Sequence, residues 1–84
     1  MPYTLFITNF SKNTTPDTIL ALFLKIDPAA ELVEWKSTYC VIKGFAPASK
    51  VKRLTDMECV EGYNIVVEYW PPKSFDVFDL ISGC

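Results

Sequence analysis

The sequence predicts an α+β fold with elements in the order β-α-β-β-α-β, followed by a short C-terminal helix. Four runs rich in β-branched and aromatic residues, at 4–10, 31–35, 39–45 and 64–70, are typical of strands. Apolar residues at helical spacing fill two of the intervals between them. These observations predict a four-stranded antiparallel sheet with two helices on one face. The 84 residues fit one domain, expected at 1–73, with a helix or tail at 74–84.

The first predicted strand covers residues 4–10 and alternates in character. Leu5 and Ile7 fall on one face, whereas Phe6 and Thr8 fall on the other. We expect the aliphatic pair to point toward the helices and Phe6 to point away from them. Polar residues 11–14 then interrupt the pattern.

The first predicted helix begins after Thr15, whose hydroxyl can accept a hydrogen bond from a free backbone N–H group. Pro16 suits the first helical position, where its missing N–H costs nothing, and Asp17 suits the positive end of the helix. Apolar residues at helical spacing form the expected core face: Ile19, Leu22, Phe23 and Ile26. Pro28 is expected to end the helix.

Residues 31–35 and 39–45 form a predicted hairpin whose register is open. A two-residue turn puts these residues on one face: Val33, Trp35, Cys40 and Ile42. It puts these on the other: Glu34, Tyr39, Val41 and Lys43. A three-residue turn would instead reverse the side of Trp35 relative to Tyr39.

The second predicted helix spans residues 47–56, with Pro47 as its first residue. Its expected sheet-facing residues are Ala48, Val51 and Leu54, and its outer residues are Lys50, Lys52 and Arg53. The last strand, 64–70, ends at two prolines. Ser74 is then expected to cap a short helix over 75–81, whose apolar side comprises Phe75, Phe78 and Ile81.

The composition favours binding over catalysis. The chain has no histidine, which excludes histidine-based catalytic triads and metal sites, and it has no glycine-rich phosphate loop. Its 8 basic and 10 acidic residues give a net charge of −2, whereas nucleic-acid binding usually leaves a basic footprint. We therefore expect a protein that is not an enzyme and needs no cofactor.

The cysteines and the hydropathy pattern indicate the cellular compartment in which we expect the protein. Cys40, Cys59 and Cys84 have spacings that match neither a disulfide framework nor a zinc motif, so no metal is expected. The sequence shows no signal peptide and no stretch long enough to span a membrane. We expect a cytoplasmic or nuclear protein of a reducing compartment, without a membrane partner.

Residues 3–70 resemble the RNA-recognition-motif (RRM) family, whose fold is a ferredoxin-like βαββαβ sandwich. The stretch Leu5-Phe6-Ile7-Thr8-Asn9-Phe10 is similar to the first-strand hexapeptide of that family. Residues 15–23 resemble its first helix, and Leu54, 60–62 and 65–67 resemble its passage from second helix to last strand. The third-strand octapeptide, residues 37–44, fits poorly. Tyr39 matches its first aromatic, but Val41 replaces the second and the leading basic-Gly pair is absent.

The resemblance implies that Phe6 and Tyr39 stack on bases, with one stacking position missing. The short hairpin also resembles the compact RRM of poly(A)-specific ribonuclease, in which a tryptophan ending the second strand stacks on the RNA cap. Trp35 matches that position.

Two functions remain open. One is an assembly module of an RNA-processing factor that binds another protein domain or a second copy. Its candidate residues are Phe6, Tyr39, Val41, Val66, Trp70, Phe75, Phe78, Ile81, Leu20 and Leu24. The other is binding of single-stranded RNA or a cap through Phe6, Tyr39 and Trp35, with Lys36, Lys43 and Lys73 on phosphates. The apolar face and the acidic balance favour the first.

Overall fold

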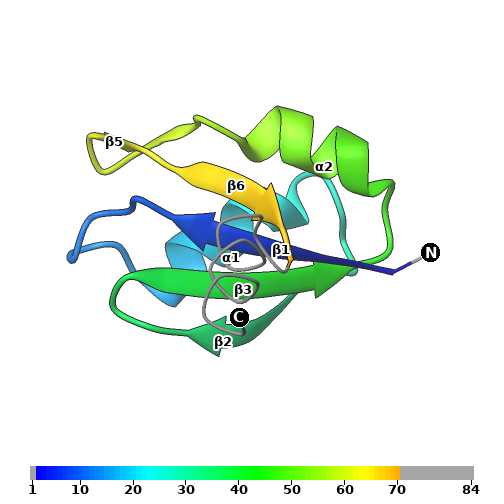
Figure 1. Ribbon diagram of the computed structural model, residues 1–84, viewed down its shortest axis with the longest axis horizontal. Coiled ribbons are helices and arrows are strands. Elements are labelled where there is room, and N and C mark those ends of the chain that lie inside the picture. Colours follow the sequence, from blue (N-terminus) through cyan, green and yellow to red (C-terminus); the bar gives the residue numbers. More distant parts are fainter. Residues whose placement is uncertain (1, 71–84) are drawn as a thin grey trace, which may run out of the picture.

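The computed structural model describes residues 2–70, which form two helices, a four-stranded sheet and a two-stranded hairpin (Figure 1). The elements are β1 (Tyr3–Thr8), α1 (Pro16–Leu24), β2 (Glu31–Trp35), β3 (Tyr39–Gly44), α2 (Ala48–Thr55), β4 (Cys59–Val60), β5 (Tyr63–Asn64) and β6 (Val66–Tyr69). The expected C-terminal helix, with Phe75, Phe78 and Ile81, lies outside the described residues, as does Lys73.

The large sheet has the strand order β2-β3-β1-β6, and all neighbouring strands are antiparallel. Figure 1 shows the four strands side by side, with α1 behind them and α2 along the β6 side. This arrangement confirms the predicted α+β fold. The central strands β1 and β3 pair over their full lengths, from Tyr3 with Gly44 to Thr8 with Tyr39. Their side chains therefore lie side by side at the centre of each face of the sheet.

The core lies between this sheet and the two helices. It is built from fully buried apolar side chains: Leu5, Ile7, Ile19, Phe23, Ile42, Val51, Ile65 and Val67. The predicted alternation of β1 is therefore confirmed. At the start of α1, Thr15 Oγ1 accepts a hydrogen bond from the Thr18 N–H group at 3.3 Å, and Pro16 is the first helical residue, as expected.

Helix α2 differs from expectation in two ways. It begins at Ala48, because Pro47 has a non-helical ψ of 121° and serves as the residue before the helix. The prediction that Leu54 faces the sheet is wrong, since this side chain is 47 % exposed and Thr55 is buried instead. The Thr55 hydroxyl donates to the Val51 carbonyl at 2.7 Å, which satisfies its hydrogen bond in the core.

The β2–β3 hairpin closes with a two-residue turn. Trp35 pairs with Cys40, and the Lys36 N–H group donates to the Tyr39 carbonyl at 2.8 Å. The register then shifts between Leu32 and Glu34. Because this β-bulge adds one residue to β2, Leu32 pairs with Ile42 and packs against the core, whereas Val33 is 54 % exposed. The expectation that Val33 shares the Ile42 face is therefore wrong.

The predicted last strand, 64–70, is divided. Its first part, β5, pairs with β4 in a small hairpin that the sequence pattern did not indicate, and β6 begins after Ile65. Ile65 lies between β5 and β6, outside the large sheet, and its N–H group donates a hydrogen bond to the Glu58 carbonyl at 3.0 Å. The Asp56 carboxylate accepts a hydrogen bond from the Val67 N–H group at 2.9 Å, so α2 is tied to the edge strand β6.

A buried carboxylate joins the end of α1 to the end of β3. Asp27, 3 % exposed, accepts four hydrogen bonds, from the Tyr3 hydroxyl (2.8 Å) and from the N–H groups of Ala29 (3.0 Å), Phe45 (2.9 Å) and Ala46 (3.1 Å). Gly44 makes this approach possible, because a Cβ atom there would overlap the carboxylate and the tyrosine ring.

Candidate binding surfaces

The sheet face that the helices leave uncovered carries most of the site residues expected from the sequence. Phe6 lies opposite Val41 on β3 and Glu68 on β6, and directly paired residues share a face. By the same pairing, Thr8 lies between Tyr39 and Val66, and Glu34 lies opposite Val41. No helix within residues 2–70 covers this surface, which we call the open face for that reason. Its members are Thr4, Phe6, Thr8, Glu34, Tyr39, Val41, Lys43, Val66 and Glu68.

A row of three aromatic rings crosses the open face. The Phe6 ring stacks on Tyr39, with centroids 5.1 Å apart, and it contacts Trp70 on its other side at 5.4 Å. Phe6 is only 8 % exposed, whereas Trp70 is 41 % exposed. The expected neighbourhood of Phe6 and Tyr39 is thus present, and the Phe6 ring is the more buried of Phe6 and Trp70.

The charges around this row are mainly acidic. The Glu34 carboxylate accepts a hydrogen bond from the Tyr39 hydroxyl at 2.6 Å. This hydrogen bond, together with desolvation, raises the pKa of the Tyr39 phenol. Glu68 is directly opposite Phe6. Lys43, the lysine expected to contact phosphate here, forms an ion pair with Glu31 at 3.8 Å. The open face therefore presents apolar rings edged by carboxylates.

Trp35 lies on the other side of the sheet. It pairs with Cys40, whose side chain is in the core, and its ring stacks on Phe10 with centroids 4.8 Å apart and an interplanar angle of 19°. Phe6, Tyr39 and Trp35 therefore do not form one platform. Phe10 reaches Trp35 because β1 ends at Thr8 and Asn9 has a φ of 62°, which turns the chain out of the sheet.

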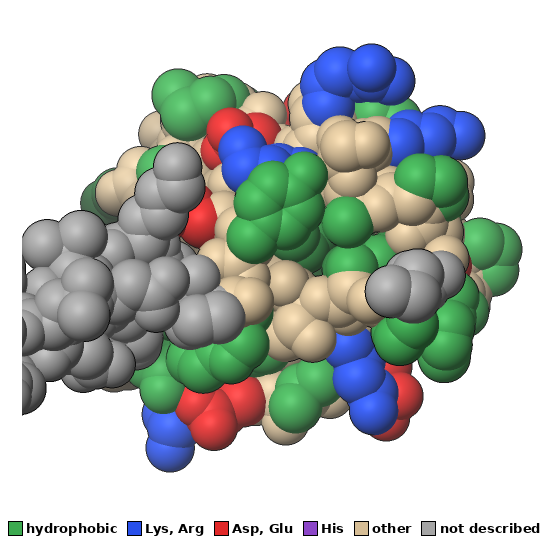
Figure 2. All heavy atoms as spheres, turned by 45° about the vertical axis from the view of Figure 1, so that its right-hand side comes forward, with side chains coloured by type: hydrophobic (Ala, Val, Ile, Leu, Met, Phe, Trp, Pro, Cys, Tyr) green, Lys and Arg blue, Asp and Glu red, His purple; other side chains and the backbone are tan. Residues whose placement is uncertain are grey.

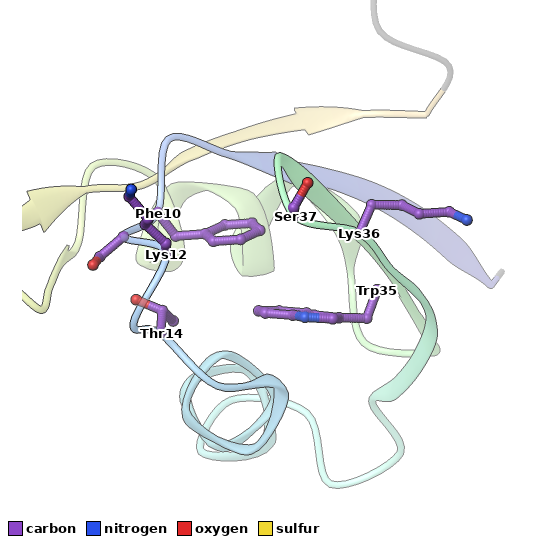
Figure 3. Close-up of a pocket in the computed structure, with 7 residues that line it drawn as sticks. Phe10, Lys12, Thr14, Trp35, Lys36 and Ser37 are labelled. Carbon is purple, nitrogen blue, oxygen red and sulfur yellow. The ribbon is translucent and has the colours of Figure 1, made fainter.

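The two stacked rings form one wall of a cavity of 260 Å³ between the β1–α1 loop and the hairpin turn (Figure 3). We call it the loop pocket; it is lined by Phe10, Ser11, Lys12, Thr14, Trp35, Lys36 and Ser37. Figure 3 shows the rings approaching from opposite sides and the Lys36 side chain extending outward. Sequence reasoning singled out Trp35 and Lys36 but missed Phe10 and Thr14.

The remaining expected site residues are distributed over other surfaces. Leu20 packs against the core, whereas Leu24 is 40 % exposed, so the two leucines do not form one exposed patch. In the view of Figure 2, Lys and Arg side chains lie in small separate groups beside hydrophobic and acidic ones. A continuous basic surface is therefore not seen on that face.

Residues 2–70 contain neither a cluster of metal-ligating side chains nor a membrane-spanning helix. This part of the chain contains no group of three side chains that would hold a metal ion. Its helices are all too short or too polar to cross a membrane. Cys40 is buried and Cys59 is exposed, and both are free thiols.

The chain is similar to known proteins in its structure and not detectably in its sequence. No protein-family model matches the sequence, and no curated protein matches it. Among solved structures, the three N-terminal RNA-binding domains of the yeast splicing factor Prp24 match with a TM-score of 0.63 and 22 % identity, over 82 % of this chain and 33 % of that one. The third RRM of Mip6 matches with a TM-score of 0.59 and 16 % identity, over 81 % of this chain and 92 % of that one. The chain has the RRM fold.

A further similar structure is the C. elegans NONO-1 homodimer, with a TM-score of 0.62 and 17 % identity, over 79 % of this chain and 27 % of that one. The chain thus spans about a third or less of the Prp24 and NONO-1 chains that it matches. Phe6 lies on β1 and Tyr39 on β3, the two central strands of the sheet, as the resemblance to the RRM family implied. The likeness of the hairpin to that of poly(A)-specific ribonuclease stays a prediction.

Proposed function

We propose that this RRM-fold chain is a non-catalytic assembly module of an RNA-processing factor in the cytoplasm or nucleus. Its open face would dock a segment of a partner protein with an apolar centre and basic flanks. The observation that carries this proposal is the Phe6, Tyr39 and Trp70 row edged by Glu34 and Glu68. Aromatic clusters of this kind are enriched at interface hot spots.

Charge complementarity favours a basic partner over the open face of a second copy. Two open faces placed against each other would bring Glu34 and Glu68 of both copies together, and like charges across an interface are unfavourable. A partner segment with Lys or Arg beside an aromatic or aliphatic residue meets both features of the face. Val41, which lies opposite Phe6 and is only 6 % exposed, adds an apolar side chain beneath the ring row.

Binding of single-stranded RNA to the same face is the second candidate. It is supported by the stacked Phe6 and Tyr39 rings and by the similarity to domains described as RNA-binding in Prp24. A base stacked on an aromatic ring contributes about 1–3 kcal/mol. The Glu34 and Glu68 carboxylates, and Glu31 beside Lys43, weigh against it, because they reduce the positive charge that this face offers to a phosphate backbone.

One pair of substitutions separates the two candidate functions, because it should weaken the binding of a basic peptide and strengthen the binding of RNA. Peptides selected from a displayed random library on the full chain would be tested by fluorescence anisotropy, alongside fluorescein-labelled RNA heptamers. The double variant Glu34→Lys, Glu68→Lys reverses the charge of the open face. We expect selected peptides to contain an apolar residue flanked by Lys or Arg, and to bind this variant at least about tenfold more weakly.

Glu58→Lys is a control for the effect of a single charge reversal, because it changes an exposed glutamate away from the open face, and it should leave peptide affinity unchanged. Tighter RNA binding by the double variant, without selection of basic peptides, would favour the second candidate. Peptides that bind wild type and double variant equally would refute the docking proposal.

A further inference from the structure

The outward surface of α2 combines apolar and basic side chains. Lys50, Arg53 and Leu54 are exposed and recur at helical spacing, whereas Val51 on the inward side is fully buried. Leu54 is 47 % exposed, and Met57, in the turn that follows the helix, is 59 % exposed. We call the four exposed residues the α2 face.

The two cations of the α2 face are available to a partner. Both salt bridges found within residues 2–70 involve other lysines, Lys43 and Lys52. The helix itself, residues 48–55, contains no carboxylate that would neutralise Lys50 or Arg53. The α2 face therefore presents an exposed apolar side chain with positive charge on both sides of it.

The α2 face and the open face are complementary. The open face carries the row of Phe6, Tyr39 and Trp70, edged by Glu34 and Glu68. The α2 face carries an exposed leucine with a lysine and an arginine beside it. These are the features that the open face requires of a partner segment, so the chain itself contains a segment that fits its own open face.

The two surfaces of one molecule point in different directions. Helix α2 contacts β1 and β6 with Val51 in the core, so its outward side faces away from the sheet and from the open face (Figure 1). A contact between the two surfaces therefore requires two copies of the chain. A helix packed on a sheet face is a common layered arrangement of proteins. The repulsion between two open faces does not arise here, because the charges that meet are opposite.

We propose that the α2 face of one copy docks on the open face of a second copy, so that the chain associates with itself head to tail. This inference rests on the proposed docking function of the open face and names its partner. Because the two surfaces in the contact differ, a bound pair keeps one α2 face and one open face, to which further copies add. A helix of 8 residues offers a small contact area, so the association is weak and needs a high local concentration.

Analytical ultracentrifugation of the full chain, between about 0.01 and 1 mM, measures the association. At about 20 mM salt we expect the average mass to rise with concentration past that of a dimer, and at about 300 mM salt to rise much less, because salt screens the charges. Lys50→Glu, Arg53→Glu reverses the charge of the α2 face and should weaken the association at least about tenfold. The matched control, Lys12→Glu, Lys25→Glu, changes the net charge equally at exposed sites outside both surfaces, and its effect should be much smaller.

Exchange of charge between the two surfaces tests whether they meet. Glu34→Lys, Glu68→Lys alone should also lose the association, because both surfaces are then basic. In one chain that also carries Lys50→Glu, Arg53→Glu, the charges are again opposite, and the association should return to within about threefold of wild type. Leu54→Ala should weaken it at least about threefold with little change in melting temperature, because this side chain is exposed.

Failure of the inference and failure of the docking function give different results. A chain that stays monomeric at about 1 mM, while selected basic peptides bind its open face, would refute the self-association and leave the docking function intact. A mass that saturates at a dimer, or an association that the charge exchange does not restore, would mean that other surfaces meet and would overturn the inference. If the chain selects no basic peptides and associates independently of Glu34 and Glu68, the docking function fails and the inference fails with it.

Discussion

The Asp27 side chain connects the loop that follows α1 to the loop that follows β3. Burial alone would raise the pKa of this carboxyl, but hydrogen bonds from the Ala46 N–H group, the Tyr3 hydroxyl and the N–H groups of Ala29 and Phe45 outweigh it and lower the pKa from 3.8 to about 2. The same proximity and burial raise the pKa of the Tyr3 phenol. The ionised carboxylate thus fixes the ends of α1 and β3 together.

Asp27→Asn should destabilise the fold by about 2–3 kcal/mol. The amide retains one acceptor oxygen, but its NH₂ group faces N–H donors and leaves them unpaired in a buried site. Urea unfolding followed by circular dichroism measures the loss. Glu58→Gln neutralises an exposed carboxylate and should change the free energy of unfolding by less than about 0.5 kcal/mol. Similar stability of the two variants would contradict the role given to Asp27.

The lowered pKa of Asp27 also predicts an acid dependence of stability. Because the carboxyl binds a proton more readily in the unfolded chain than in the folded one, its stabilisation is complete above an ordinary pKa of 3.8 and is lost as pH falls toward about 2. Unfolding curves of wild type and Asp27→Asn across this window should therefore converge. A stability difference that stays constant down to pH 2 would show that Asp27 ionises normally in the fold.

At the scale of elements, the bulge in β2 reverses the expected roles of two neighbours. Simple alternation from Trp35 would bury Val33, whereas the structure buries part of Leu32 against the core and exposes Val33. We predict that Leu32→Ala lowers the free energy of unfolding by about 2 kcal/mol, and Val33→Ala by less than about 0.5 kcal/mol. Denaturant titration of both variants decides the register, and the opposite ranking would mean that the bulge is absent.

Sequence patterns predicted those elements whose signal is local. The β1 alternation, the Thr15 cap and the order of the helices and large-sheet strands were accessible from the sequence. The register of the β2–β3 hairpin, and with it the side of the sheet on which Trp35 lies, stayed open until the structure showed the two-residue turn. The bulge at Val33 was not accessible, because no glycine or proline marks it. Leu54 was misassigned because a buried Thr55 is stable only when its hydroxyl finds the Val51 carbonyl, which spacing alone does not reveal.

In the candidate sites, too, the contacts that follow from strand pairing were predictable, whereas those that depend on an unusual backbone conformation were not. Adjacent Phe6 and Tyr39 follow from strand alternation and pairing, so they were predictable. The contact of Phe10 with Trp35 depends on the positive φ of Asn9, an uncommon conformation that brings together residues 25 positions apart in the chain. Asparagine tolerates this conformation better than most residues, which is the one signal the sequence contained.

For the whole molecule, the two described thiols should report different events. Cys40 is completely buried, and burial raises the pKa of its thiol to about 12, whereas Cys59 is exposed. In a Cys84→Ser variant treated with iodoacetamide at about pH 8, Cys59 should react at once and Cys40 only as the domain unfolds. Mass spectrometry with increasing urea measures both. Early labelling of Cys40 in native buffer would indicate that the sheet opens without global unfolding.

Both outer strands of the sheet are poorly suited to accept another strand. The bulge interrupts the regular spacing of hydrogen-bonding groups along β2, where Glu31 and Glu34 add charge, and Asp56 already occupies the Val67 N–H group on β6. Regular, uncharged edges are the templates on which sheets of different molecules join into fibres. This small domain, half of whose residues are hydrophobic, is therefore protected at both edges of its large sheet against strand-by-strand growth into a fibril.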